Sequence, residues 1–248
     1  MIIGKTTKLP YFPELRGSLD AMKFPALVEP KLDGELGIWN GMCLINKYGK
    51  TRRDFPAVNK LTTADCIGEL YTNQGLAGEL YTLSKNKTSD NLKFTIFDIP
   101  VTDLTLVSRR EVMFETFPKE SIIEARVAST KEEALALYQL YIVKGYEGAV
   151  VKSLDSMWLT GPCSWVKIKH KDRSQYQICL IDTTQERIEV MVPIPPSPGN
   201  LTIIQKYVKV GVKCISKYKV KLKVGDFCTV EHQGVLVSGS LRHPVYIK

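Results

Sequence analysis

The residues with the clearest chemical potential lie in the segment Glu29-Pro-Lys31-Leu-Asp33-Gly34. Apolar residues before Lys31 predict a strand, and the Asp-Gly pair after it is typical of a turn. A strand that ends at a turn holds the lysine side chain in a fixed direction. A neutral lysine amine is a nucleophile that can form a covalent intermediate. A lysine followed two residues later by Asp-Gly also occurs by chance, so this segment carries little weight alone.

Four further motifs follow, and two lysines in the last of them matter most. Alternation along a strand places Lys167 and Lys169 on one face, so both can point into one pocket. Neighbouring cations lower the pKa of a lysine and offset charge on a phosphate in a transition state. The alternative is a solvated strand edge, which is common for such pairs. The motifs are Gly78-Glu79, Phe94-Thr-Ile-Phe97-Asp98, Glu147-Gly-Ala-Val-Val-Lys152 and Trp165-Val-Lys167-Ile-Lys169.

This ordered set resembles the covalent nucleotidyltransferase superfamily, which comprises ATP-dependent DNA ligases, RNA ligases and messenger-RNA capping enzymes. The resemblance extends from about Val28 to Pro244. Near the end of the chain, Val224-Gly-Asp226-Phe and Ser238-Gly-Ser-Leu-Arg242-His-Pro244 are similar to the last strands of the oligonucleotide-binding (OB) domain of phage DNA ligases. Among these families, the chain is most similar to small ATP-dependent DNA ligases of the phage or viral type.

The resemblance implies a role for each charged residue of the motifs. Lys31 is the nucleophile that forms lysyl-AMP from ATP, and Lys167 and Lys169 act at the phosphates. Glu79 contacts the ribose or its metal, and Glu147 serves the metal site, where Mg²⁺ or Mn²⁺ is expected. Without the resemblance, both glutamates would be interpreted as surface carboxylates.

The resemblance also implies a base-binding end of the site. Phe97 stacks on adenine, although an aromatic residue in this setting is more often part of the core. Glu29 lies beside the base.

The chain departs from the family pattern at several positions where the family has arginine. Lys47 stands where the family has an arginine after a hairpin. Leu36 stands in place of a second arginine, and the arginine expected directly before Trp165 is missing from residues 159–164. No Arg-x-Asp-Lys motif follows Pro244. These departures put in doubt how the 5′-phosphate and pyrophosphate are bound, and Arg52 or Arg53 could substitute.

The elements that position these residues are mixed α+β in the first two thirds of the chain. Asn40-Gly41 is typical of a tight hairpin turn. Thr130 and Glu133 form a capping box before an apolar periodic segment. Arg109-Arg110 falls where ligases have a basic pair, although a solvated helix start explains it nearly as well. We expect strands over 28–32, 37–39, 42–47, 76–82, 94–99, 148–152 and 165–169, and helices over 108–117 and 131–143.

The last third of the chain differs from the first two thirds in its predicted secondary structure and in its charge. Residues 173–248 contain 11 Lys and Arg against 5 Asp and Glu, whereas residues 1–172 contain 23 against 21. Strict alternation over 217–224 predicts a strand with a cationic face and an apolar face that packs inward. Short strands with a cationic face indicate a small all-β barrel of the OB-fold kind that binds nucleic acid. The expected contacts are Lys217, Lys219, Lys221, Lys223 and Arg242.

We therefore predict two domains. Residues 1–172 form a nucleotidyltransferase domain of antiparallel sheets with helices, similar to the ATP-grasp-like adenylation domain of DNA ligases, and residues 173–248 form the OB-fold barrel. The predicted activity is ATP-dependent sealing of nicked duplex DNA through lysyl-AMP and DNA-adenylate. The alternatives are an RNA ligase, a capping guanylyltransferase that uses GTP, and a non-catalytic nucleic-acid-binding relative.

The composition of the chain excludes several classes of protein. The 248 residues are 44% hydrophobic and 24% charged, as in ordinary globular proteins. No apolar segment approaches the roughly 20 residues of a membrane span, and the N-terminal segment does not resemble a signal peptide. Six cysteines without a CxxC pair and three histidines argue against a structural zinc site. We expect a cytoplasmic monomer whose partner is DNA.

Overall fold

The computed structural model describes residues 13–15, 17–52, 64–72, 92–159, 161–182, 187–193, 207–213, 222–236 and 238–247. Contacts divide the chain into two units, Met1–Lys169 and His170–Lys248. The sequence places the boundary after Asp172, three residues later. In the described ranges, no helix is long and apolar enough to cross a membrane.

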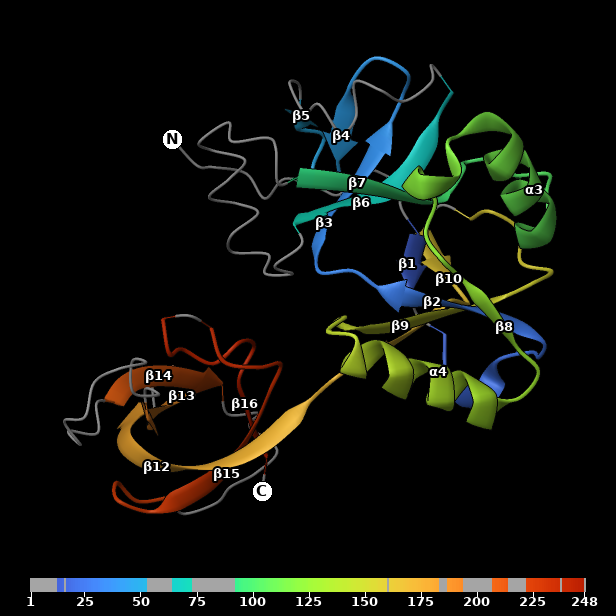
Figure 1. Cartoon of the computed structure of the whole chain (residues 1–248). Coiled ribbons are helices and arrows are strands. Elements are labelled where there is room, and N and C mark those ends of the chain that lie inside the picture. The colour runs from blue at the N-terminus through green and yellow to red at the C-terminus, as the bar shows by residue number, and fades with distance from the viewer. Residues whose placement is uncertain are drawn as a thin grey trace. The chain divides into compact units, whose positions relative to one another are not determined.

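The first sheet of unit 1 carries the nucleophile motif. Its order is β11-β9-β2-β8, and all neighbouring strands are antiparallel. Helix α4 covers one face (Figure 1), where Ala134 and Tyr141 pack against Val28 and Val151. Alternation then directs the side chains between these apolar residues to the opposite face. The elements are β2 (Ala26–Lys31), β8 (Arg126–Ala128), α4 (Lys131–Val143), β9 (Gly148–Ser153) and β11 (Val166–Lys169).

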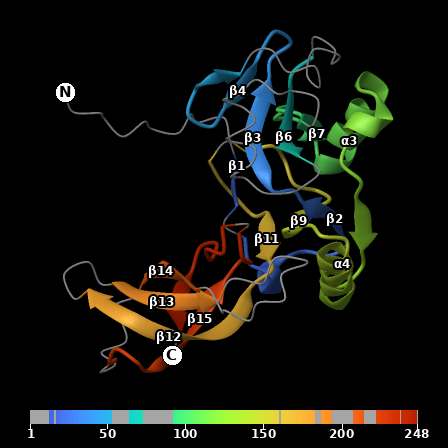
Figure 2. The same cartoon turned by 60° about the vertical axis from the view of Figure 1, so that its left-hand side comes forward.

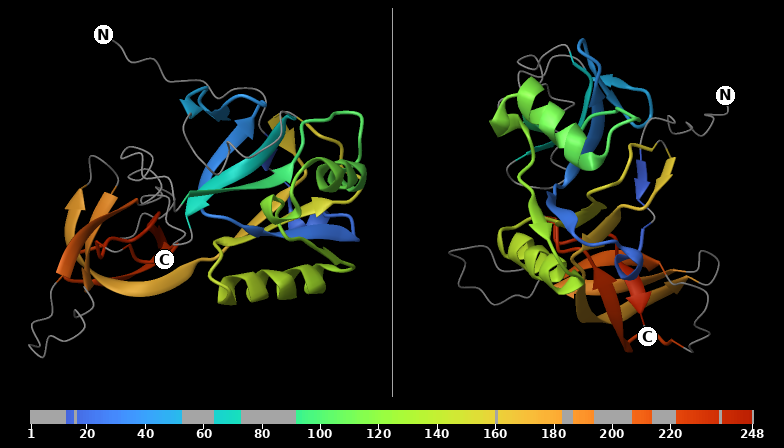
Figure 3. Two further views of the ribbon diagram at one scale, coloured as in Figure 1. Left: turned by 45° about the horizontal axis from the view of Figure 1, so that its top comes forward. Right: turned by 90° about the vertical axis from the view of Figure 1, so that its right-hand side faces the viewer.

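The second sheet of unit 1 has the order β5-β4-β3-β6-β7 and is antiparallel throughout. Its core contains Trp39, Leu70 and Phe94 and is closed by Met113 of helix α3. Helices α3 and α4 thus pack against different sheets (Figure 3). The elements are β3 (Gly34–Trp39), β4 (Leu44–Asn46), β5 (Thr51–Arg52), β6 (Cys66–Thr72), β7 (Leu92–Asp98) and α3 (Leu106–Thr116).

A buried ion pair joins α3 to the end of β7. Arg109 Nε lies 2.7 Å from Asp98 Oδ1, and Nη2 lies 3.1 Å from Oδ2. Arg109 Nη1 also donates to the carbonyl oxygens of Leu104 at 2.8 Å and Ser156 at 3.0 Å. Both charged side chains are fully buried, so the interpretation of Arg109 as part of a solvated helix start is wrong. The pair fixes the backbone directly after Phe97.

The described part of unit 1 also contains smaller elements. Strand β1 (Pro13–Leu15) pairs in parallel with β10 (Gly161–Cys163). Two 3-10 helices, η1 (Leu19–Ala21) and η2 (Lys119–Ser121), connect longer elements.

Unit 2 contains a closed five-stranded barrel with the order β12-β13-β14-β16-β15. Figure 2 labels β12, β13, β14 and β15 of this barrel. Neighbouring strands are antiparallel except for β14 and β16. Branched residues such as Ile178, Val190, Val212 and Val230 form its interior. The strands are β12 (Asp172–Asp182), β13 (Arg187–Pro193), β14 (Tyr207–Lys213), β15 (Phe227–His232) and β16 (Val245–Ile247).

Most local predictions in unit 1 agree with these elements. The α4 prediction is confirmed, and Thr130 Oγ1 accepts from the Glu133 N–H at 3.2 Å, as a cap requires. The Asn40-Gly41 turn is also confirmed, because Asn40 N–H donates to the Cys43 carbonyl and Gly41 has a φ of 79°. The expected strand over 76–82 lies outside the described residues.

The strand expected over 217–224 is wrong at its end. Leu222 packs against the barrel core, but Val224 is 62% exposed. The Asp226 carboxylate accepts from the Lys223 N–H at 3.0 Å, and Gly225 has a φ of 96°. A turn therefore interrupts the alternation after Leu222, and Lys223 lies outside any strand.

Candidate active site

The strand register of the first sheet brings the predicted nucleophile next to a predicted phosphate-binding lysine. Lys31 of β2 pairs with Gly148 of β9, and Gly148 pairs with Lys169 of β11. A Cβ on Gly148 would lie 1.9 Å from the Ile168 carbonyl oxygen, so this close strand approach needs glycine. The two lysines are thus separated by a residue that has no side chain.

Glu147 fills the space between the two ammonium groups. Its Oε2 accepts a short hydrogen bond from Lys31 Nζ, and its Oε1 lies 2.6 Å from Lys169 Nζ. The Glu147 N–H donates to the Lys31 carbonyl oxygen at 3.1 Å, which fixes the backbone as well. Burial raises the pKa of Glu147, but the attraction of Lys31 and Lys169 outweighs it and holds this pKa below its usual range. Glu147 is therefore an anion shared by two cations.

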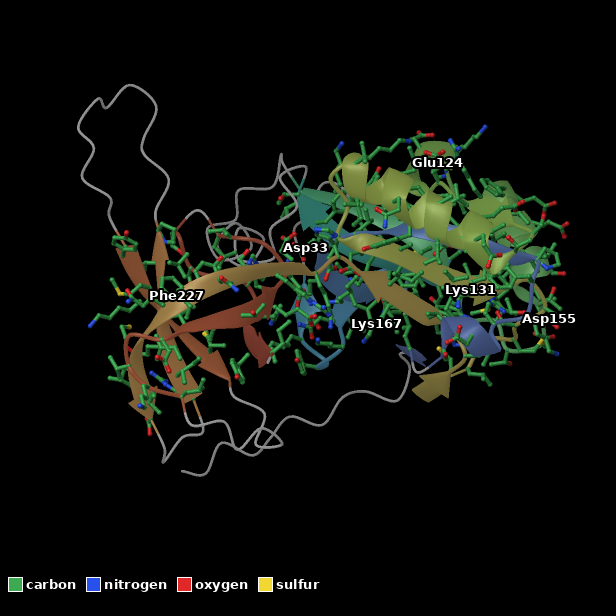
Figure 4. The ribbon with its side chains drawn as sticks, turned by 90° about the horizontal axis from the view of Figure 1, so that it is seen from below. Asp33, Glu124, Lys131, Asp155, Lys167 and Phe227 are labelled. Carbon is green, nitrogen blue, oxygen red and sulfur yellow. The ribbon has the colours of Figure 1, made fainter. Side chains whose placement is uncertain are left out.

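Lys31 lines a cavity of about 500 Å³, a size typical of small-molecule sites. Six of the residues predicted to bind the nucleotide line it together. Lys167 is the more exposed of the two β11 lysines and is labelled in Figure 4. The predicted lining residues found there are Glu29, Lys31, Lys47, Phe97, Lys167 and Lys169.

Glu69 of β6 is a pocket residue that the sequence interpretation missed. Burial raises the pKa of Glu69 to about 7; Lys31 and a hydrogen bond from the Gly34 backbone counteract this, whereas Glu147 and Asp33 add to it. The sequence signal is that Gly-Glu-Leu-Tyr-Thr occurs twice, at 68–72 and at 78–82. The interpretation took the second copy, and its Glu79 lies outside the described residues.

Two residues before Lys31 on β2, the pocket holds a buried carboxylate with two cationic partners. Glu29 Oε2 lies 2.6 Å from Lys152 Nζ, and Oε1 lies 3.2 Å from Arg110 Nη1. Burial raises the pKa of Glu29, although Lys152 and Arg110 counteract this effect. Arg110 was noted in the sequence only as half of a basic pair, and Lys152 was given no role.

A tight turn presents Lys47 at the pocket. The Asn46 side-chain oxygen accepts from the N–H groups of Tyr48 and Lys50, each at 3.0 Å, and so stabilises the turn. Lys47 Nζ lies 5.0 Å from the centre of the Tyr48 ring. Leu36, which stands where many ligases have an arginine, also lines the pocket. The Arg52 side chain and all of Arg53 lie outside the described residues, so their suggested substitution stays a prediction.

The sequence of unit 1 matches a family model described as the ATP-dependent DNA ligase domain, over residues 6–169. This match covers more than half of the chain. The protein belongs to the ATP-dependent DNA ligases. A search of curated proteins found no match.

Solved DNA ligase structures share the fold of this ligase. A structure from a study of minimal Lig E DNA ligases has a TM-score of 0.75 at 17% identity, with 96% of this chain and 98% of that chain covered. Chlorella virus DNA ligase-adenylate has a TM-score of 0.54 at 14% identity, with 98% of both chains covered. The bacteriophage T7 ligase complex with ATP has a TM-score of 0.51 at 15% identity, with 96% of this chain and 98% of that chain covered. At these identities the likeness concerns the fold.

The donor set of the ligase fits a divalent cation that binds together with phosphates. In the ranges that the structure describes, no three His, Cys, Asp or Glu side chains are grouped as a metal site. Mg²⁺, however, is usually held by one or two carboxylates, water and substrate phosphates. Glu69 and Glu147 are close enough to Lys31 for their charges to interact with it. These two carboxylates could hold such an ion beside the nucleophile.

Of the predicted nucleic-acid contacts, two lie in the described part of unit 2. Lys223 is exposed in the turn before β15. Arg242 belongs to the loop before β16, where its N–H donates to the Gly234 carbonyl at 3.0 Å and its carbonyl accepts from the Gln233 N–H at 2.8 Å. Lys217, Lys219 and Lys221 lie outside the described residues.

Proposed function

We propose that this ligase seals nicks in duplex DNA through a covalent AMP on Lys31. The observation that supports this most directly is the placement of the Lys31 amine in the cavity, where Glu147 links it to Lys169. Phe97 and Glu29 line the same cavity and supply a site for the base.

In the first step the Lys31 Nζ attacks the α-phosphorus of ATP. A nitrogen–phosphorus bond forms, the bond from that phosphorus to its bridging oxygen breaks, and pyrophosphate leaves. Lys31 must first lose a proton, because the neutral amine is the nucleophile. Lys167 and Lys169 counter the charge that builds up on the phosphate oxygens.

The second and third steps transfer AMP and close the strand. An oxygen of the 5′-phosphate at the nick attacks the phosphorus of lysyl-AMP, and the Lys31 amine leaves. The 3′-hydroxyl then attacks the activated 5′-phosphate, a phosphodiester forms and AMP departs. A bound Mg²⁺ would polarise phosphate oxygens in this chemistry, with Glu69 and Glu147 as its protein ligands.

Unit 2 is proposed to be an OB-fold domain that contacts the DNA backbone, and the enzyme is proposed to act as a monomer. The closed barrel with strands in the order β12-β13-β14-β16-β15 supports the fold. The excess of Lys and Arg over Asp and Glu in residues 173–248 supports a polyanionic partner.

Labelling with nucleotide tests the chemistry. The wild type should form a covalent adduct with α-labelled ATP and little with GTP. Lys31→Ala should form none, and neither should Lys31→Arg, because a guanidinium does not deprotonate near neutral pH. Lys93→Ala, a change at an exposed lysine of β7, is the matched control and should label normally. Normal labelling of either Lys31 variant would overturn the assignment of the nucleophile.

Sealing assays test the substrate. We expect a nicked DNA duplex to be sealed much faster than a nicked RNA duplex or single strands, and a chelator of divalent cations should stop sealing. Equal or faster sealing of an all-RNA nick would replace this proposal with an RNA ligase.

A further inference from the structure

Lys152 is a buried cation of the pocket that takes no part in the bond-making steps. It lies on β9, where Leu27 of β2 is its register partner, and its side chain is 1% exposed. A lysine is seldom buried this completely unless its charge is paired. It lies at the base-binding end of the pocket, away from the Glu147 carboxylate that Lys31 and Lys169 share. The roles of Lys31 and Lys169 at the phosphates therefore do not account for it.

Four groups surround the Lys152 ammonium. Glu29 Oε2 lies at 2.6 Å and the Phe97 carbonyl oxygen at 3.2 Å. The ring centres of Phe97 and Trp165 lie 4.8 Å and 4.2 Å away, which is within cation–π range. One ammonium group therefore contacts both the main chain and the ring of Phe97.

Further contacts hold the residue after Phe97 and the ring of Trp165. Asp98, the next residue, is held by two hydrogen bonds from buried Arg109. Trp165 is held by an edge contact with Trp158, at 5.9 Å between ring centres. The Lys152 ammonium thus contacts two aromatic rings, each of which has a further supporting contact nearby.

Glu29 is engaged on both oxygens, by Lys152 and by Arg110. Its carboxylate is therefore held in one orientation by two cations. The ammonium of Lys152 is the group that this carboxylate shares with the Phe97 ring and carbonyl.

We propose that Lys152 is a positioning residue that fixes Phe97 and Glu29 as a preformed site for the nucleotide base. This rests on the proposed function, in which Phe97 stacks on adenine. Stacking depends on the orientation of the ring, so loss of the ammonium weakens the base contact. Binding of the phosphates depends on Lys167 and Lys169 and is independent of Lys152.

Lys152→Met separates these two effects in the full-length enzyme. We expect the KM for ATP in adduct formation to rise about tenfold or more, as for loss of one base–aromatic stack. The Ki of inorganic tripolyphosphate, a competitor that has phosphates and no base, should change by less than about twofold. Lys93→Met, on the same strand as Phe97, is the matched control and should alter neither constant.

Lys152→Met removes one of the two cations that pair with the buried Glu29 carboxylate and leaves Arg110 as the other, so this variant can fail to fold. A second variant provides a control for this outcome. The double variant Lys152→Met, Glu29→Gln removes both charges and should fold while keeping the raised KM. A normal KM in either folded variant overturns the role of Lys152, and so does a parallel rise of KM and Ki, which would indicate general damage to the pocket. Absence of any ATP adduct in the wild type would instead overturn the proposed function and this inference with it.

Discussion

Glu69 provides a stability test that needs no substrate. Burial raises the pKa of Glu69 from 4.5 to about 7. The folded protein therefore keeps a proton on Glu69 at pH values where the unfolded chain has lost it. Stability falls as the pH rises from about 4.5 to about 7, and the loss is complete above that range. A glutamine at this position cannot ionise, so Glu69→Gln should escape the loss.

The size of the effect follows from the shift. A difference of about 2.5 pKa units corresponds to about 3 kcal/mol of unfolding free energy. The glutamine side chain retains an oxygen that can accept the hydrogen bond from the Gly34 backbone. We therefore expect Glu69→Gln to be more stable than the wild type by up to about 3 kcal/mol at pH 8 and to match it near pH 4.5.

Urea unfolding followed by tryptophan fluorescence measures this effect in unit 1 alone, because Trp39, Trp158 and Trp165 all lie there. Glu115→Gln, at an exposed carboxylate on α3, is the matched control and should stay within about 0.5 kcal/mol of the wild type at every pH. A stability difference for Glu69→Gln that does not change between pH 4.5 and pH 8 would refute the reasoning.

Three further changes test other parts of the structure. Arg109→Met should destabilise unit 1 by about 3–5 kcal/mol in the same urea assay, since it leaves Asp98 buried and unpaired; a loss below 1 kcal/mol would contradict the buried pair. Glu147→Gln should slow adduct formation about a hundredfold or more, because it removes both the partner of Lys31 and a metal ligand; normal labelling would exclude both roles. Replacing Lys217, Lys219, Lys221 and Lys223 with glutamine should lower the slope of log affinity for nicked DNA against log salt by about 3 to 4 while adduct formation changes little; an unchanged slope would mean that these lysines do not contact phosphates.

The sequence predicted best where the signal is local. Helix α4 follows from a capping box and an apolar period within 14 residues, and its bounds agree with the structure. The convergence of Lys31, Lys167 and Lys169 was predictable only through the family motifs, because their proximity depends on the register of β2, β9 and β11. Alternation along single strands gives the face of each lysine but not which strand lies beside it.

Predictions failed where a turn or a tertiary contact overrides a local pattern. The alternation of residues 217–224 predicted an inward Val224, but the Asp226 side chain and Gly225 form a turn instead. Arg109 resembles a solvated helix residue in sequence, and only the fold shows that Asp98 lies against it. Lys152 has no local signal at all, since its partners Glu29, Phe97 and Trp165 come from other strands or their ends.

The repeated pentapeptide gives a matched pair of variants, because Glu69 and Glu79 have the same four neighbours in sequence. Local sequence therefore cannot distinguish their roles, whereas the structure places Glu69 on β6 in the wall of the pocket and in electrostatic contact with Lys31. If this carboxylate helps to hold the cation that accompanies ATP, Glu69→Gln should reduce adduct formation by about a hundredfold or more, as for loss of several kcal/mol of charge stabilisation. Glu79→Gln should then have a small effect, and raising the Mg²⁺ concentration should restore part of the rate only in Glu69→Gln. The opposite ranking, with Glu79→Gln inactive and Glu69→Gln active, would restore the original assignment of Glu79 as the metal ligand.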